Sequence, residues 1–232
     1  MRRRLPILAV LLAALAPATL QAQADSRPGI AVFPFTNGGS FGAEREDLEA
    51  LTIGIQQMLL TELSQNGALR IVERSRLREL LEEQKLGTSG QVDAGTAARV
   101  GKLVGARYVV TGVFIDLNGN FRLDGRIVDV ETSEILKTAQ VRDRRDNLYE
   151  LLFDLAAKIT DDVKLPPLPA EVREERRARE IPAEAVTLYS QAQVAQDLGR
   201  KERAVELYRQ IANRFPQMTE ASEALRQLTG GD

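Results

Sequence analysis

The sequence predicts an α/β domain (a mixed, α+β type sheet with helices packed on it, in the order βαβαβββα) followed by a small all-α helical hairpin. Short runs of strand-forming residues alternate with stretches in which Leu, Ile and Val recur at helical spacing. Residues 71–112 show this alternation most clearly: a strand is followed by a helix, a Gly/Ser-rich connection, a second helix and a second strand. Beyond residue 164, after a Pro-rich stretch, only helical periodicity follows.

Residues 1–24 predict a secretory signal peptide. Three arginines are followed by an apolar stretch that ends near Leu20, and Ala22 and Ala24 form an A-x-A signal peptidase recognition site. Two prolines interrupt the apolar stretch, which is shorter than the roughly 20 residues of a membrane span. We therefore expect cleavage after Ala24 and a periplasmic mature protein without a transmembrane segment.

Two residue types that are absent from the chain exclude several classes of function. The chain has no Cys and no His. This excludes lipid attachment at a cysteine, disulfides, and serine–histidine or cysteine–histidine catalysis, and it argues against a zinc site. After loss of three arginines the mature chain has 28 basic and 33 acidic residues, a net charge of −5, which argues against a nucleic-acid partner. We expect a protein that is not an enzyme and has no cofactor or metal.

The first elements of the α/β domain, assigned to residues 25–164, begin with a buried strand at 29–35. Pro34 must lie at its end or at an unpaired position, because proline cannot donate to a ladder. A helix from about Asp47 to Asn66 follows, and then a strand at 69–73. The Gly-rich loop 36–43 matches neither common phosphate-binding pattern, so a flexible turn is predicted there.

The second part of the domain contains three predicted strands, at 108–114, 121–127 and 135–141, and a closing helix at 148–163. Asp116 to Asn120 has the D-x-N-x-N spacing of a calcium loop. However, Phe121 and Ile127 stand where that loop requires Gly and Glu. A hairpin turn without a metal is predicted instead.

The motif Glu73-Arg74-x-x-Leu77-x-x-Leu80-Leu81-x-Glu83-Gln84, then Gly101-x-x-x-Gly105-Ala106-x-Tyr108-Val-Val-Thr-Gly112, resembles the CsgG family of curli-secretion and outer-membrane assembly proteins. The strand IAVFPF and the turn IVDVETSEIL lie where that family has similar motifs. The resemblance covers about residues 28–164. It extends to FlgO-like proteins, the N-terminal domain of TolB and LpoB-like activators, and it implies the fold and an envelope role.

Three departures from the family limit what the resemblance implies. The pore-forming member is a lipoprotein, and this chain has no Cys. The family inserts transmembrane hairpins into two connections, which here are only Leu117–Asn120 and about 142–147. Each membrane strand needs roughly 9–11 residues, so neither connection can hold a hairpin. Ser133 replaces a Gly expected at a left-handed position, at a cost of about 1 kcal/mol.

Residues 165–181 are predicted to be a linker, first Pro-rich and then charged. Residues 182–232 predict a single tetratricopeptide-like helical repeat with a capping helix. Six residues have the spacing of such a repeat: Leu188, Ala192, Gly199, Ala204, Tyr208 and Pro216. A plain helical hairpin is the alternative. One repeat cannot bury its apolar face alone, so it should dock on the first domain, self-associate or hold a partner.

The predicted function is that of a periplasmic adaptor or assembly factor in cell-envelope biogenesis or secretion. Its partners would be other envelope or secretion proteins, held by the repeat or the sheet domain, and self-association is left open. The alternative is a periplasmic small-ligand or glycan-binding module with loop 36–43 as its pocket.

Overall fold

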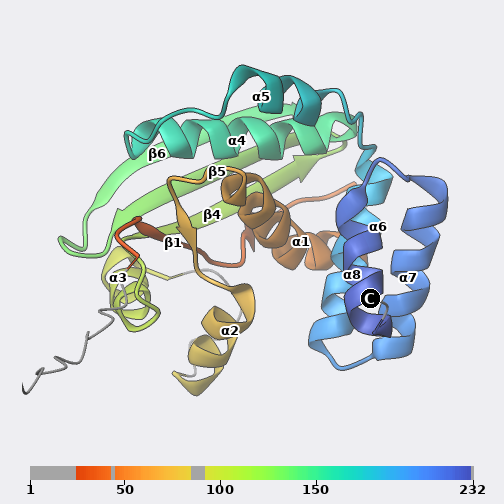
Figure 1. Cartoon of the computed structure of the whole chain (residues 1–232), viewed down its shortest axis with the longest axis horizontal. Helices are drawn as coiled ribbons and strands as arrows, with labels where there is room; N and C mark the ends of the chain where they lie inside the picture. The colour runs from red at the N-terminus through yellow and green to blue at the C-terminus, as the bar shows by residue number, and fades with distance from the viewer. Residues whose placement is uncertain (1–24, 43–44, 85–91, 231–232) are drawn as a thin grey trace, which may run out of the picture.

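The computed structural model describes residues 25–42, 45–84 and 92–230. Its centre is one mixed sheet with the strand order β3-β1-β4-β5-β6 (Figure 1). β1 and β3 lie parallel to each other and β1 lies parallel to β4, whereas β4, β5 and β6 form an antiparallel meander. The strand bounds are β1 Gly29–Val32, β2 Thr36–Asn37, β3 Arg70–Ile71, β4 Tyr108–Leu117, β5 Asn120–Asp129 and β6 Ile135–Arg144. The predicted mixed α/β class is confirmed.

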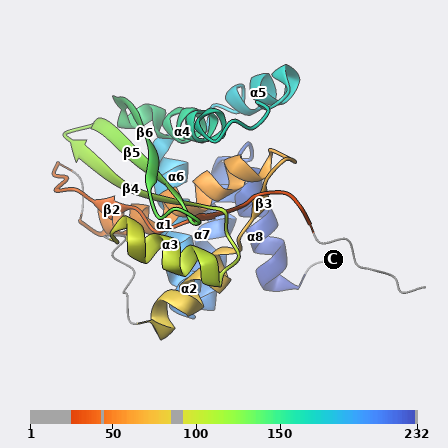
Figure 2. The same cartoon turned by 90° about the vertical axis from the view of Figure 1, so that its left-hand side faces the viewer.

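Helices cover both faces of the sheet (Figures 1 and 2). One face packs against α1 (Arg45–Ser64) and α4 (Leu148–Asp162), whose leucines and isoleucines belong to a large apolar cluster. The other face packs against α2 (Arg74–Glu83) and α3 (Ala94–Leu103) in a smaller, separate cluster. Two helices, α2 and α3, therefore lie between β3 and β4 in the chain. The predicted element order βαβαβββα has only one helix at this point.

The first predicted strand is shorter than expected because it contains Pro34. β1 ends at Val32, and the chain then pairs irregularly: Phe33 N donates to Val110 O, and Phe35 N donates to Thr52 O of α1. β2 resumes parallel pairing with β4 at Thr36, after three intervening residues. Pro34 thus lies at an unpaired position, as its missing N–H requires.

The two connections that could carry hairpin insertions are short and bound to each other. The β4–β5 turn contains Asn118 and Gly119 in the left-handed region, with φ of 53° and 84°. Arg145, in the turn after β6, pairs with the buried carboxylate of Asp116 and donates its N–H to Gly119 O. Ser133 has φ 62°, so the predicted left-handed position is confirmed.

The C-terminal helices do not stand apart from the sheet domain. They are α5 Ala170–Arg177, α6 Ala183–Asp197, α7 Lys201–Arg214 and α8 Thr219–Thr229. Buried residues of α6, α7 and α8 belong to the same apolar cluster as those of α1, α4 and the sheet. Gly54 permits this close packing, since a Cβ added there would lie 1.7 Å from Ser190 Oγ on α6. We call α6, α7 and α8 the helical unit; of the ways expected to cover its apolar face, it docks on the first domain.

The segment predicted as a linker, 165–181, is more structured than that description. It contains α5, and the largely covered side chains of Arg176 and Arg179 pair with acidic residues of other elements. Two of the arginines in this charged segment turn inward because carboxylates of α1 and α8 lie opposite them.

Candidate functional site: a groove between α1, α6 and α7

The six residues predicted to pack a tetratricopeptide-like repeat lie in the helical unit. Ala192 on α6 and Ala204 on α7 are fully buried. Gly199 takes φ 69° in the turn between these helices, and Pro216 follows the end of α7. Leu188 is partly buried against the large cluster. The helical hairpin and its capping helix are therefore present, while membership of the repeat family stays a prediction.

Tyr208, the sixth predicted residue, is buried in a polar network inside the helical unit. Its hydroxyl accepts a hydrogen bond from Gln193 Nε2 at 2.7 Å and donates one to Gln196 Oε1 at 3.0 Å. The rings of Tyr189 and Tyr208 lie 5.7 Å apart. Burial raises the pKa of both phenols, so each remains a neutral hydrogen-bonding group. This network orients α6 against α7.

The other predicted site residues, Ala22 and Ala24, lie outside the described residues, as does part of the loop 36–43. In the described part of that loop the backbone donors are engaged. Gly38 N donates to Phe114 O and Phe41 N to Asp116 O, while the N–H groups of residues 39 and 40 donate to Asn37 Oδ1. Residues 38–41 therefore offer no free backbone N–H for an anion.

A polar cluster fixes the helical unit beside α2. Arg74 and Arg78 both pair with Asp197 near the end of α6. Arg74 also donates to Gln193 Oε1 at 2.8 Å and to Gln57 Oε1 at 3.1 Å. On the far side, Gln191 Nε2 donates to Asp47 Oδ1 on α1 at 2.7 Å. These contacts hold α6 in one orientation along α1.

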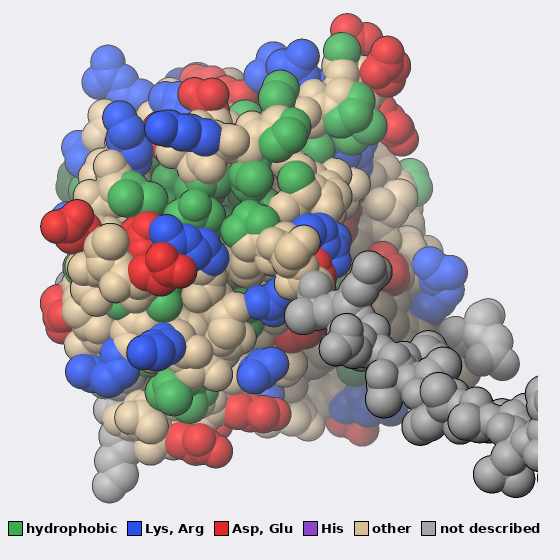
Figure 3. Space-filling model, turned by 60° about the vertical axis from the view of Figure 1, so that its left-hand side comes forward, with side chains coloured by type: hydrophobic (Ala, Val, Ile, Leu, Met, Phe, Trp, Pro, Cys, Tyr) green, Lys and Arg blue, Asp and Glu red, His purple; other side chains and the backbone are tan. Residues whose placement is uncertain are grey.

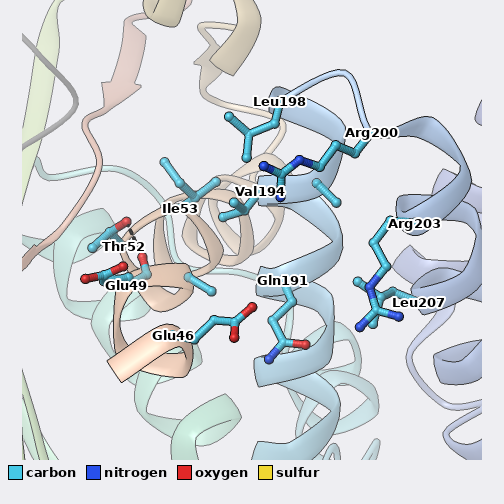
Figure 4. A pocket seen from close by; sticks show the side chains of 12 residues that line it. Glu46, Glu49, Thr52, Ile53, Gln191, Val194, Leu198, Arg200, Arg203 and Leu207 are labelled. Carbon is cyan, nitrogen blue, oxygen red and sulfur yellow. Dashed lines mark hydrogen bonds between the residues drawn. The ribbon is translucent and has the colours of Figure 1, made fainter. Parts of the chain in front are cut away.

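A groove opens along this junction, over α6 and between α1 and α7 (Figure 4). Its volume is about 460 Å³. The groove has an apolar floor contributed by all three helices: Ala50, Ile53, Val194, Ala195, Leu198 and Leu207. Leu198 is the most exposed of these, with 59% of its surface accessible. Leu198 therefore extends the partly buried apolar surface of Ile53 and Val194 into solvent.

The two sides of the groove carry opposite charges (Figure 4). α1 supplies Glu46 and Glu49 on one side, and Arg200 and Arg203 lie on the other side, at the start of α7. Glu49 pairs with Arg45 and Arg203 pairs with Glu206, but both pairs are exposed, so their partners can be exchanged at little cost. Within the described part of the chain, Glu46 and Arg200 form no ion pair.

The sequence reasoning missed this groove. It singled out the small residues and the turn that shape the helical unit, but not Leu198, Ile53 or the four charged residues. The one available signal was Leu198 itself, a large apolar residue directly before the turn glycine. Which side of α1 would face it depended on the docking of the two units, and no local pattern encodes that.

The charged side chains on one face of the molecule are not segregated by sign. Figure 3 shows one face on which Lys and Arg side chains alternate with Asp and Glu, with a small group of apolar side chains among them. No extended area of one sign is visible on that face. Among the residues that the structure describes, no helix has the length and apolarity needed to cross a membrane.

Comparisons with known proteins agree with the motifs in the sequence. The family model for CsgG, the curli production assembly/transport component, matches residues 12–125. That match ends within β5, before β6 and α4, which the expected resemblance also included. No curated protein matches the chain.

Several solved structures resemble part of the chain. The LpoB C-terminal domain from Salmonella enterica is 22% identical, covering 53% of this chain and 88% of that one, with a TM-score of 0.40. TolB from Acinetobacter baumannii is 17% identical (60% of this chain, 28% of that one, TM-score 0.36). The PelC dodecamer from Paraburkholderia phytofirmans is 16% identical (60% and 90%, TM-score 0.35). All three are distant. Residues 12–125, together with the motifs they contain, are similar to the CsgG family.

Proposed function

We propose that this chain is a non-enzymatic periplasmic protein of the CsgG-like group that acts as an adaptor or assembly factor in cell-envelope biogenesis or secretion. The observation that carries the proposal is the groove, because both the α/β domain and the helical unit build it. A surface shared by two docked units is suited to holding a segment of another protein. The family relation supports the envelope setting.

The short connections at 117–120 and 142–147 support an adaptor over a pore. The first is a tight turn, and in the second β6 runs to Arg144 and a short 3-10 helix, Arg145–Asn147, leads directly into α4. The ion pair between Asp116 and Arg145 joins the two connections. The chain would thus keep the scaffold of its family and act through contacts. The alternative, a small-ligand module that uses loop 36–43, has less support because the backbone donors of residues 38–41 are already engaged.

Cross-linking in the periplasm followed by affinity capture tests this proposal. The mature protein should recover envelope or secretion proteins, and Leu198→Asp should remove them by placing a charge on the groove floor. Leu103→Asp is the matched control, because Leu103 is a leucine of similar exposure on α3, away from the groove. A protein that stays monomeric and captures nothing would contradict the proposal.

A further inference from the structure

The groove has features that restrict its partner further, and this inference rests on the function proposed above. We infer that its occupant is an amphipathic helix of another protein. This helix would have an apolar face flanked by basic residues on one side and by acidic residues on the other. The chemistry of the floor and the charges of the two rims lead to this choice.

The floor favours a helix over an extended segment. Beyond their first turns, α1, α6 and α7 pair their backbone groups by intrahelical bonds, so the walls of the groove present no open strand edge. The two uncharged polar side chains that line the groove are also engaged: Thr52 Oγ1 donates to Glu49 O at 2.7 Å, and Gln191 Nε2 donates to Asp47 Oδ1 at 2.7 Å. An extended segment would bury unpaired N–H and C=O groups here, whereas a helix brings its backbone already paired.

The shape of the floor agrees with that choice. Ala50 and Ala195 are buried small residues, which let a docking helix approach the backbone of α1 and α6 closely. Ile53, Val194 and Leu198 form the apolar floor on which side chains spaced three and four residues apart along a helix would lie. Burial of Leu198, which is largely exposed in this chain, would contribute favourably to binding.

The rims select the charges of the partner. Glu46 and Glu49 of α1 attract a basic flank, while Arg200 and Arg203 attract an acidic one. The start of α7 strengthens the second preference. This helix begins without a side-chain cap, at Arg200, and its N-terminal dipole end adds positive potential to that of the two arginines. Because the rims differ in sign, a partner with one sign on both flanks would face like charges on one side.

Three synthetic helical peptides with the same apolar face test the inference: one with a Lys flank and a Glu flank, one with Lys on both flanks, and one with Glu on both. Their binding to the mature protein is measured by fluorescence anisotropy at low salt. The mixed peptide should bind about tenfold more tightly than either of the others, and added salt should reduce the difference.

Two protein variants, each with the charges on one side of the groove reversed, test whether peptide preference follows these charges. Arg200→Glu with Arg203→Glu makes both rims acidic and should transfer the preference to the Lys peptide. Glu46→Lys with Glu49→Lys makes both rims basic and should transfer it to the Glu peptide. All four side chains are exposed, so we expect both variants to fold, which circular dichroism checks.

If each protein binds the three peptides alike, or if the preference does not follow the rim charges, the inferred partner chemistry is wrong. The capture experiment then decides separately whether the groove holds another kind of partner. Capture that depends on Leu198 would preserve the proposed function while this inference fails.

Discussion

Two of the contacts that join the helical unit to the rest of the chain differ in kind. At the crossing of α1 and α6 the contact depends on a missing side chain, because a Cβ at Gly54 would lie 1.7 Å from Ser190 Oγ. At α5 and the residues directly after it the contact depends on charge: Arg176 and Arg179 both pair with Glu220 of α8, and Arg176 also pairs with Glu62 of α1. The first contact should respond to added volume and the second to pH and to removal of a charge. The two can therefore be disrupted separately.

The largest expected effect follows from breaking the charged contact. Arg176 Nε donates to Glu62 Oε2 at 3.0 Å, and the Glu62 side chain is only 1% exposed. Arg176→Ala would leave that carboxylate buried without its partner, which typically costs about 3–5 kcal/mol of unfolding free energy. Urea unfolding measures this loss.

A double variant separates lost charge pairing from lost packing. Replacing both partners, as Arg176→Met with Glu62→Leu, should recover most of the stability, because no buried charge is left unpaired. If the double variant is as unstable as Arg176→Ala, unpaired charge is not the cause.

Added volume at the helix crossing should have the next largest effect. Gly54→Ala gains up to about 1 kcal/mol of helix stability. Its Cβ would nevertheless overlap Ser190 Oγ, and overpacking of this kind costs about 1–3 kcal/mol. We expect a net loss in urea unfolding. Ser190→Gly in the same chain should restore part of it, and Gly67→Ala, where an added Cβ meets open space, should show no loss.

Local features of the fold could be predicted from the sequence, whereas contacts between distant residues could not. The periodicity of leucines along α4 and the turn signal at Ser133 depend on neighbours in the chain, so strands, helices and turns were predicted close to their observed bounds. The contacts of Arg176 with Glu62 and of Gly54 with Ser190 join residues more than a hundred positions apart. Nothing local distinguishes Arg176 from the neighbouring Arg177, which is exposed. The groove depends on the same distant docking and was missed for that reason.

Acid should weaken the charged contact without affecting the crossing. Burial acts to raise the pKa of Glu220, but the hydrogen bond and charge of Arg179, with that of Arg176, outweigh it and hold the pKa below the usual 4.5. A lowered pKa contributes stability above the value of the unfolded chain, and this is lost as the pH falls through the folded value. Stability should therefore decline below pH 4.5.

The decline of stability in acid can be measured with a signal that comes from the junction with the helical unit. The chain has no Trp and four Tyr, and Tyr149, Tyr189 and Tyr208 lie in or against the helical unit. Near-ultraviolet circular dichroism of tyrosine during thermal melts therefore reports on the junction. Glu220→Gln should be less stable at neutral pH and should show a flatter decline in acid. An unchanged acid profile in this variant would assign the titration to other carboxylates.

The smallest effect on the unfolding free energy is expected from removing a solvent-exposed ion pair between α5 and α4. Arg177 pairs with Asp154 of α4 at 2.9 Å, one residue along the chain from Arg176, with side chains 63% and 49% exposed. Asp154→Asn removes the charge and keeps the shape, and Arg177 retains its contact with the Phe153 ring. Water and salt screen such pairs, so the unfolding free energy should change by no more than about 0.5 kcal/mol. If Asp154→Asn costs as much as Arg176→Ala, burial does not explain the strength of the α5 contact, and the sequence position of the arginines matters more than their environment.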